Sequence, residues 1–263
     1  MSFKGFLNHI FSQKDASSRE TPVNWNEKRK HNRVEFKDNQ GLFVHLLSPE
    51  GAGSARTLGA TVRNLSVRGC WLNFPSSVDR DRLNVGGEFV ATLAVDDFPI
   101  PLHVEVIRLI GDTEAAIRFK PPFPRELEKL ERFLEPHCLG MSLREIDQAS
   151  LQNVKETGMR WFQGVNETNL FSWTDVQTKD IVQQQLLFLG NVVEWTKTNP
   201  LRTGRIRGEE PSLSPTVGWI KAELLEFHAA PEEKLILHAK TILEASGVSA
   251  DVRNIFLNKL KKR

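Results

Sequence analysis

The segment from residue 33 to residue 120 constrains the fold most strongly, because it consists of short runs with the spacing of β-strands. The runs are residues 33–36, 41–47, 57–65, 70–74, 88–95, 98–109 and 115–119. Turn-forming residues separate them, and no helical pattern intervenes. About six strands with such short connections must close or stack to protect their edges. We therefore expect a six-stranded antiparallel β-barrel.

A helix is expected directly after the barrel. The prolines of the Pro121-Pro122-Phe123-Pro124 segment end the sheet. Residues 125–137 then carry apolar side chains at helical spacing, namely Leu127, Leu130, Phe133 and Leu134. This helix should pack on the barrel or cap an open end of it. The predicted barrel domain, with its terminal helix, therefore covers residues 25–138.

The N-terminal residues 1–24 are expected to form a short helix and a linker. Apolar residues between Phe3 and Phe11 have helical spacing, so a short amphipathic helix is predicted within residues 1–13. Such a helix either docks on its own domain or makes a peripheral contact with a membrane or a partner. Residues 17–26 are poor in apolar side chains and resemble a linker.

Beyond residue 140 the pattern changes, and an all-α helical domain is expected over residues 141–263. A capping-box pattern, Ser142 with Glu145, predicts a helix over 142–157 that ends at Gly158. Further helices are expected over 178–197, 216–227, 231–245 and 249–261, with a loop over 199–216. The predicted fold class is therefore α+β multidomain, a barrel followed by a helical output or interaction domain.

Composition excludes several function classes. A formal net charge of +2 disfavours a bulk electrostatic grip on a nucleic-acid polymer. Cys70 and Cys138 form no CxxC pattern, which argues against zinc and a disulfide framework and fits a reducing compartment. The sequence has neither an apolar run of membrane-spanning length nor a signal peptide, so a cytoplasmic protein is expected.

No catalytic or metal-binding pattern stands out. The GxSxG, P-loop and HExxH motifs do not occur. The seven histidines are scattered and do not combine with Cys, Asp or Glu at ligand spacing. We therefore expect a protein that is not an enzyme and that needs no metal or cofactor.

Two short segments at the start of the β-rich region form the candidate binding site. The first is a basic cluster that contains Arg29 and Arg33, and the second is Asn64-Leu65-Ser66-Val67-Arg68-Gly69. An arginine fork suits both a phosphate and the O6/N7 edge of guanine. Asn64 offers amide groups for a base edge, and Ser66 can hold the turn or a phosphate. Gly69 permits a positive φ or the close approach of a ligand.

Two neighbouring basic residues are additional candidates. Arg68 lies inside the second segment and can reach a phosphate or a base. Lys28 precedes Arg29 in the basic cluster.

In these two segments the chain resembles the PilZ domain family of bacterial cyclic di-GMP receptors. The family motif is Arg-x-x-x-Arg followed by Asp/Asn-x-Ser-x-x-Gly, and the resemblance covers about residues 25–138. It implies that Arg29 and Arg33 bind the phosphates and guanine of cyclic di-GMP, and that Asn64, Ser66 and Gly69 frame a guanine. In the family, the residue before the first arginine influences ligand stoichiometry. Here that residue is Lys28, which does not decide the number of ligands.

The resemblance implies a second-messenger receptor, in which ligand binding is transmitted from the barrel to a partner-binding domain in motility, biofilm or secretion control. The alternative is a PilZ-type adaptor that does not bind the nucleotide and acts through protein contacts. A nucleic-acid-binding barrel is disfavoured by the charge and by the lack of an aromatic series along the strands.

Overall fold

The computed structural model describes residues 33–36, 42–47, 57–95, 98–121, 124–147, 158–207 and 225–261. The chain divides into two compact units, one that contains Pro136–Arg263 and one that contains Asn24–Glu135. The division falls inside a helix, a few residues before the position near 140 at which the sequence pattern changes. The predicted N-terminal helix and the linker lie outside the described residues.

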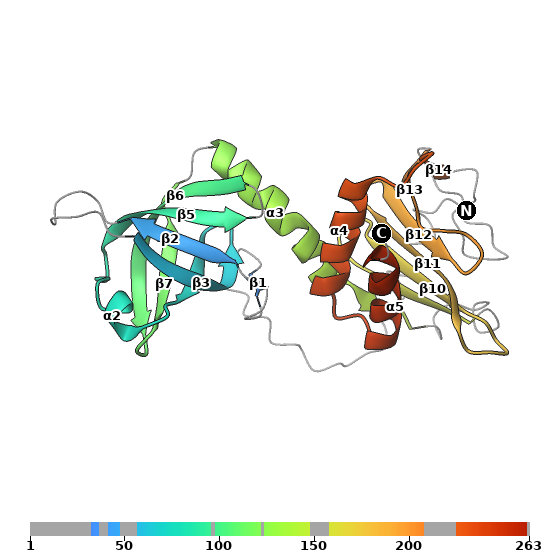
Figure 1. Cartoon of the computed structure of the whole chain (residues 1–263), viewed down its shortest axis with the longest axis horizontal. Helices are drawn as coiled ribbons and strands as arrows, with labels where there is room; N and C mark the ends of the chain where they lie inside the picture. The colour runs from blue at the N-terminus through green and yellow to red at the C-terminus, as the bar shows by residue number, and fades with distance from the viewer. Residues whose placement is uncertain are drawn as a thin grey trace, which may run out of the picture. The chain divides into compact units, whose positions relative to one another are not determined.

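The Asn24–Glu135 unit contains a closed antiparallel barrel (Figure 1). Its strands are β1 (Val34–Glu35), β2 (Phe43–Leu47), β3 (Thr57–Ser66), β4 (Gly69–Asn73), β5 (Glu88–Val95), β6 (Phe98–Ile110) and β7 (Glu114–Phe119). The order is β1-β3-β2-β5-β6-β7-β4, and an additional pairing of β3 with β4 closes the ring. Strand β1 pairs with one end of β3 and β2 with the other end, so six strands close the barrel, as predicted.

The barrel is filled by alternate residues of its strands. Leu46, Leu72, Leu93, Val104 and Val106 are completely buried, while their neighbours along the chain are partly or fully exposed. This alternation is what a strand with one face on a core requires. A four-residue helix, α2 (Ser77–Arg80), lies between β4 and β5.

The predicted helix after the barrel is present as α3 (Pro124–Ser142). Leu130 and Leu134 are buried, and the ring of Phe133 stacks on that of Phe36 with centroids 6.1 Å apart. The helix is longer than predicted and continues through Pro136 to Ser142.

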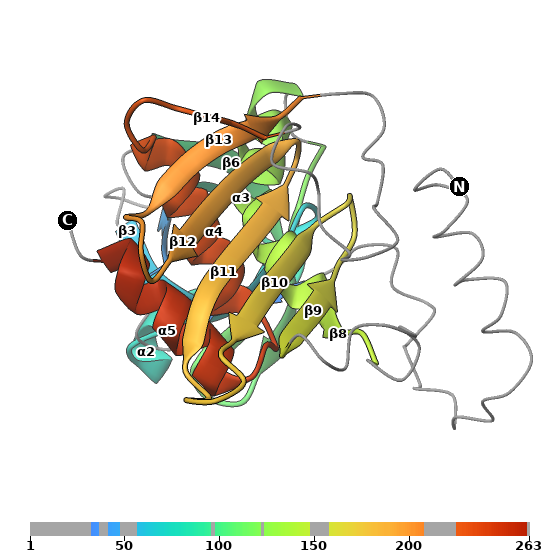
Figure 2. The same ribbon diagram turned by 90° about the vertical axis from the view of Figure 1, so that its right-hand side faces the viewer.

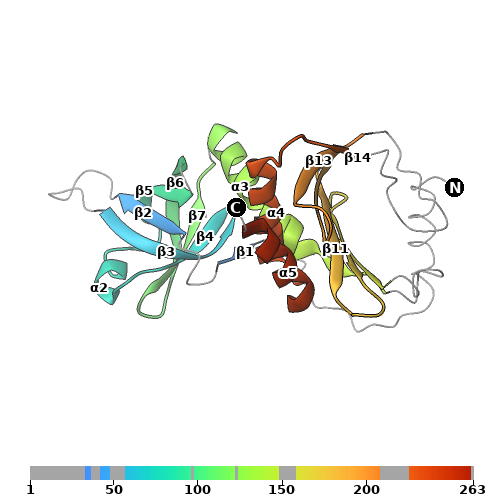
Figure 3. The ribbon, with the colours of Figure 1, turned by 45° about the vertical axis from the view of Figure 1, so that its right-hand side comes forward.

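The expectation of an all-α domain beyond residue 140 is wrong. This unit contains a seven-stranded antiparallel meander, in which each strand pairs with the next along the chain (Figure 2). The strands are β8 (Arg144–Glu145), β9 (Met159–Gln163), β10 (Asn169–Thr174), β11 (Ile181–Phe188), β12 (Asn191–Thr196), β13 (Arg202–Ile206) and β14 (Leu225–Phe227). Two helices, α4 (Glu233–Ala245) and α5 (Ala250–Lys261), pack on one face of this sheet (Figure 3).

Burial on both faces of the sheet explains why the prediction of a helix over residues 178–197 is wrong. The chain forms the hairpin of β11 and β12 there. Leu186, Phe188 and Val193 face the core beneath α4 and α5, whereas Leu187 and Val192 belong to a second cluster with Trp161 and Trp173. A strand that is buried on both faces shows a continuous apolar run, which periodicity cannot distinguish from a buried helix.

The predicted helix over 142–157 is also wrong in its described part. Ser142 is the last residue of α3 rather than an N-cap, and its hydroxyl donates to the Leu139 carbonyl. Glu145 lies in β8 and pairs with Arg160. The remaining residues, 148–157, lie outside the described ranges.

The predictions for residues 199–261 are correct only in part. The predicted loop over 199–216 contains β13, and the predicted helix over 216–227 ends in β14, with residues 216–224 outside the described ranges. The last two helices are present: α4 begins two residues after Pro231, and α5 begins one residue after Ser249.

Candidate functional site

The pairing of β1 with β3 places Arg33 beside the turn that joins β3 to β4. Val34 lies opposite Leu65, and Glu35 lies opposite Asn64. Arg33, which is exposed and immediately precedes β1, therefore lies alongside the Ser66 end of β3. Burial raises the pKa of the Cys70 thiol above its usual range, and the positive charge of Arg33 opposes that rise. The guanidinium is thus within electrostatic range of the start of β4.

Ser66 holds the turn between β3 and β4. Its hydroxyl donates to the Gly69 carbonyl at 3.1 Å and accepts from the Arg68 backbone N–H at 3.3 Å. Ser66 as a whole residue is only 4% exposed. Of the two roles that the sequence left open for Ser66, the structure shows the turn-holding one.

Gly69 is required by the closure of the barrel rather than by a left-handed backbone. It is not among the described residues with a positive φ. A Cβ at this position would lie 2.2 Å from the backbone carbonyl oxygen of Ile117 on β7. The close approach that calls for a glycine is therefore made by the neighbouring strand.

A β-bulge presents Asn64 on the outer face of the barrel. The register of β3 against β4 shifts between Val62 and Asn64, so Arg63 is the extra residue and Asn64 lies opposite Trp71. The Asn64 Oδ1 atom is buried and has no hydrogen-bond partner among the described residues. Bulges of this kind are frequent beside binding sites, where they re-aim a side chain.

Trp71 is a neighbour of the site that the sequence motifs did not identify. It lies directly opposite Asn64, and its indole Nε1 is also buried without a partner in the described part of the chain. The alternation along a strand from Gly69, which puts residues 69, 71 and 73 on one face, is the signal that could have found it.

Three arginines surround the turn. Besides Arg33, Arg68 is exposed within the turn itself, and Arg118 lies opposite Gly69 on β7. Arg118 donates to Glu105 at 2.9 Å, which neutralises part of its charge. The arrangement suits an anion that carries more than one phosphate, because several guanidinium groups can share it.

The structure does not place two of the predicted site residues. Lys28 and Arg29 lie outside the described residues, so the position of the first motif arginine relative to the turn stays a prediction. Among the described residues, Arg33, Asn64, Ser66, Arg68 and Gly69 come together around one turn.

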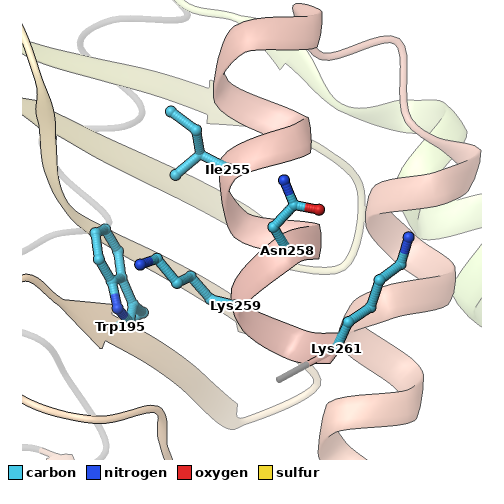
Figure 4. A pocket seen from close by; sticks show the side chains of 5 residues that line it. All are labelled: Trp195, Ile255, Asn258, Lys259 and Lys261. Atoms are coloured by element: carbon cyan, nitrogen blue, oxygen red, sulfur yellow. The ribbon is translucent and has the colours of Figure 1, made fainter. Parts of the chain in front are cut away.

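A pocket lies in the other unit and is lined by Trp195, Ile255, Asn258, Lys259 and Lys261 (Figure 4). The Lys259 ammonium lies 4.2 Å from the centre of the Trp195 ring. Both lysines belong to the last turn of α5, where cations stabilise the negative end of the helix dipole. The fold therefore accounts for these charges without a ligand.

The described residues hold neither a metal-ligand cluster nor a helix that could span a membrane. They contain no group of three His, Cys, Asp or Glu side chains placed to hold a metal ion. Among the helices described, none combines the length and the apolar character needed to cross a bilayer.

Comparison with known proteins gives structural similarities alone. No protein-family model and no curated protein matches the chain. The PilZ domain of YcgR from Escherichia coli, solved with c-di-GMP, is 15% identical with a TM-score of 0.34, over 41% of this chain and 89% of that one. The PilZ domain of CeSA from a cellulose synthesizing bacterium is 12% identical with a TM-score of 0.31, over 40% and 95%.

A third similarity extends further along the chain. The PlzA protein of Borreliella burgdorferi, solved in complex with c-di-GMP, is 15% identical with a TM-score of 0.28, over 82% of this chain and 96% of that one. Similarities at these identities and TM-scores assign neither a family nor a ligand to this chain.

Proposed function

We propose that the barrel is a receptor site for cyclic di-GMP at the turn between β3 and β4. The observation that carries the proposal is the pairing of β1 with β3, in which Arg33 lies alongside the Ser66 end of β3 and so next to the Ser66–Gly69 turn. The second arginine of one motif and the whole of the other are distant in sequence and adjacent in the fold.

Each residue of the proposed site is assigned to the part of cyclic di-GMP that its side chain can bind. Arg33, with Arg29 on the segment that precedes it, supplies forks for phosphate oxygens or for the O6/N7 edge of a guanine. Asn64 supplies an unpartnered acceptor for the donors of a guanine. Arg68 adds positive charge within the turn, and Arg118, which is paired with Glu105, lies opposite Gly69 on β7.

The second unit supplies the output in this proposal. Binding at the barrel alters the contacts of the Pro136–Arg263 region with a protein partner in a bacterial signalling pathway. Support comes from the two-unit organisation, since a separate unit is available for a separate task.

Calorimetry of the full-length protein with cyclic di-GMP tests the site. Arg33→Ala and Arg29→Ala should each weaken binding about 10- to 150-fold, because a hydrogen bond to a charged group contributes roughly 1.5–3 kcal/mol. Arg132→Ala is the matched control, because Arg132 is an exposed arginine of α3 whose described partner is Glu128 on the same helix. Unchanged affinity in both Arg29→Ala and Arg33→Ala would refute the site.

The adaptor alternative has one observation in its favour. Ser66 and Gly69 are both used by the barrel itself, for the turn and for the contact with β7. A barrel that had lost the ligand would still need them. Failure of the wild-type protein to bind cyclic di-GMP at high micromolar concentration would favour the adaptor hypothesis.

A further inference from the structure

We propose that Trp71 contacts the ligand. In this proposal the indole N–H of Trp71 and the side-chain Oδ1 atom of Asn64 form a donor–acceptor pair for one guanine edge. This inference rests on the proposed function, because it names a further residue of the same site. It assigns to Trp71 a role that neither sequence motif includes.

The register of β3 against β4 places the side chains of Asn64 and Trp71 next to each other. Asn64 on β3 and Trp71 on β4 are directly opposite each other in the antiparallel pair. Directly opposed residues have Cβ atoms about 4.5–5.5 Å apart, so their side chains share one patch of the surface. Their neighbours Leu65, Cys70 and Leu72 are buried in the barrel, which fixes Asn64 and Trp71 on the outer face.

The same face carries the rest of the proposed site. Along β4, Trp71 follows Gly69 by two residues and therefore points to the same side of the sheet. Arg33 precedes Glu35 by two residues, and Glu35 lies opposite Asn64. On the other side of Trp71, strand β7 places Ala116 directly opposite, and the side chain of Ala116 is a single methyl group.

The two unpartnered atoms are complementary. The Asn64 Oδ1 atom is an acceptor and the Trp71 Nε1–H group is a donor, and each is buried without a hydrogen-bond partner among the described residues. An unpaired buried polar group is destabilising, and native proteins retain few of them. A guanine presents an acceptor, O6, next to a donor, N1–H, so one base edge can satisfy both atoms.

A structural role for Trp71 makes a different prediction. A tryptophan that serves only to cover the barrel needs its ring but not its N–H. Phenylalanine keeps an apolar ring and removes the unpaired donor, so Trp71→Phe separates the two roles.

The test compares Trp71→Phe with wild type in two measurements on the full-length protein. Calorimetry should show cyclic di-GMP affinity reduced about 2- to 12-fold, the range for one neutral hydrogen bond. Thermal unfolding without ligand should show no loss of stability. In a ¹H–¹⁵N spectrum, the indole signal that is missing from Trp71→Phe should move when the ligand is added to wild type.

Trp161→Phe is the matched control. The Trp161 Nε1–H group donates to Asn169 Oδ1 at 2.9 Å in the other unit. Its removal should lower stability and leave affinity unchanged, the reverse of the pattern expected at Trp71.

The outcomes separate this inference from the proposed function. Affinity lost in Arg33→Ala but unchanged in Trp71→Phe overturns the inference alone. Absence of binding by wild type overturns both. Weaker binding with an unmoved indole signal also overturns the inference, because it assigns the effect to packing.

Discussion

Substitution of Gly69 by alanine tests whether the motif glycine serves the barrel or a ligand. The added Cβ would lie 2.2 Å from the Ile117 carbonyl oxygen and 3.2 Å from the Arg118 Cα, both of them backbone atoms of β7. Backbone in the middle of a paired strand cannot rotate away as a flexible side chain would. We therefore expect β4 and β7 to separate locally, with a loss of about 1–3 kcal/mol in the free energy of unfolding, the usual range for overpacking.

Gly59 provides the control within the same barrel. It lies in β3, its φ is not positive, and a Cβ there would meet nothing within 4 Å. Gly59→Ala should therefore be neutral or should stabilise the barrel by about 0.4–1 kcal/mol through the unfolded chain. The two variants therefore add the same methyl group, at Gly69 against the backbone of β7 and at Gly59 into unoccupied space.

Hydrogen exchange measured by mass spectrometry along a urea series is the suitable assay, because the chain has two units and a single global transition is not assured. Peptides from β4 to β7 report the barrel, and peptides from β9 to β12 serve as an internal reference. A Gly69→Ala variant that binds no ligand yet keeps wild-type barrel stability would refute the reasoning. It would show that the glycine makes room for a ligand instead of for β7.

Three further substitutions test other parts of the structure. Gly190→Ala should destabilise the second unit by about 1–2 kcal/mol in urea denaturation, because Gly190 has a φ of +73°; stabilisation would indicate the helix that the sequence suggested. Glu194→Ala should cost about 1.5–3 kcal/mol in the same assay, since Arg202 and Gln185 lose a shared, buried acceptor; no change would contradict the ion pair. The backbone N–H groups of residues 178 and 177 hold the pKa of the Asp175 carboxyl below its usual value, so Asp175→Ala should be less stable than wild type at pH 7. That difference should begin to shrink below about pH 3.9 and vanish once the folded-state carboxyl is protonated; a difference that persists there would exclude the charged capping interaction.

The barrel was predictable because its strands have one face on the core and one on solvent. Residues such as Val104 and Val106 are buried and their neighbours are not, so the period of two is visible in the sequence. The turn motif was also visible, since the Asn-x-Ser-x-x-Gly residues are close together in the chain. The proximity of Arg33 to this turn followed only from the family resemblance, because nothing local specifies that β1 pairs with the end of β3.

The second unit was not predictable by the same reasoning. Its central strands are apolar on both faces, so β11 and β12 lack the period of two. The turn between them contains Leu189, a residue that rarely adopts the positive φ of +50° found here, so the hairpin carries a weak turn signal. The capping-box pattern at Ser142 does not mark the start of a helix, because that hydroxyl bonds to the Leu139 carbonyl at the end of α3.

The geometry of the turn changes which residues can distinguish a receptor from an adaptor. Ser66 and Gly69 are needed to build the turn and to close β4 against β7, so their presence follows from the fold alone. Within the described part of the barrel, Arg33 has no hydrogen-bonding role and the Asn64 Oδ1 acceptor has no partner. Arg33 and Asn64 are therefore the two motif residues whose presence is explained by a ligand and not by the described barrel. A substitution at Arg33 or Asn64 that abolishes binding while leaving barrel stability intact is the result that would separate a binding function from a folding one.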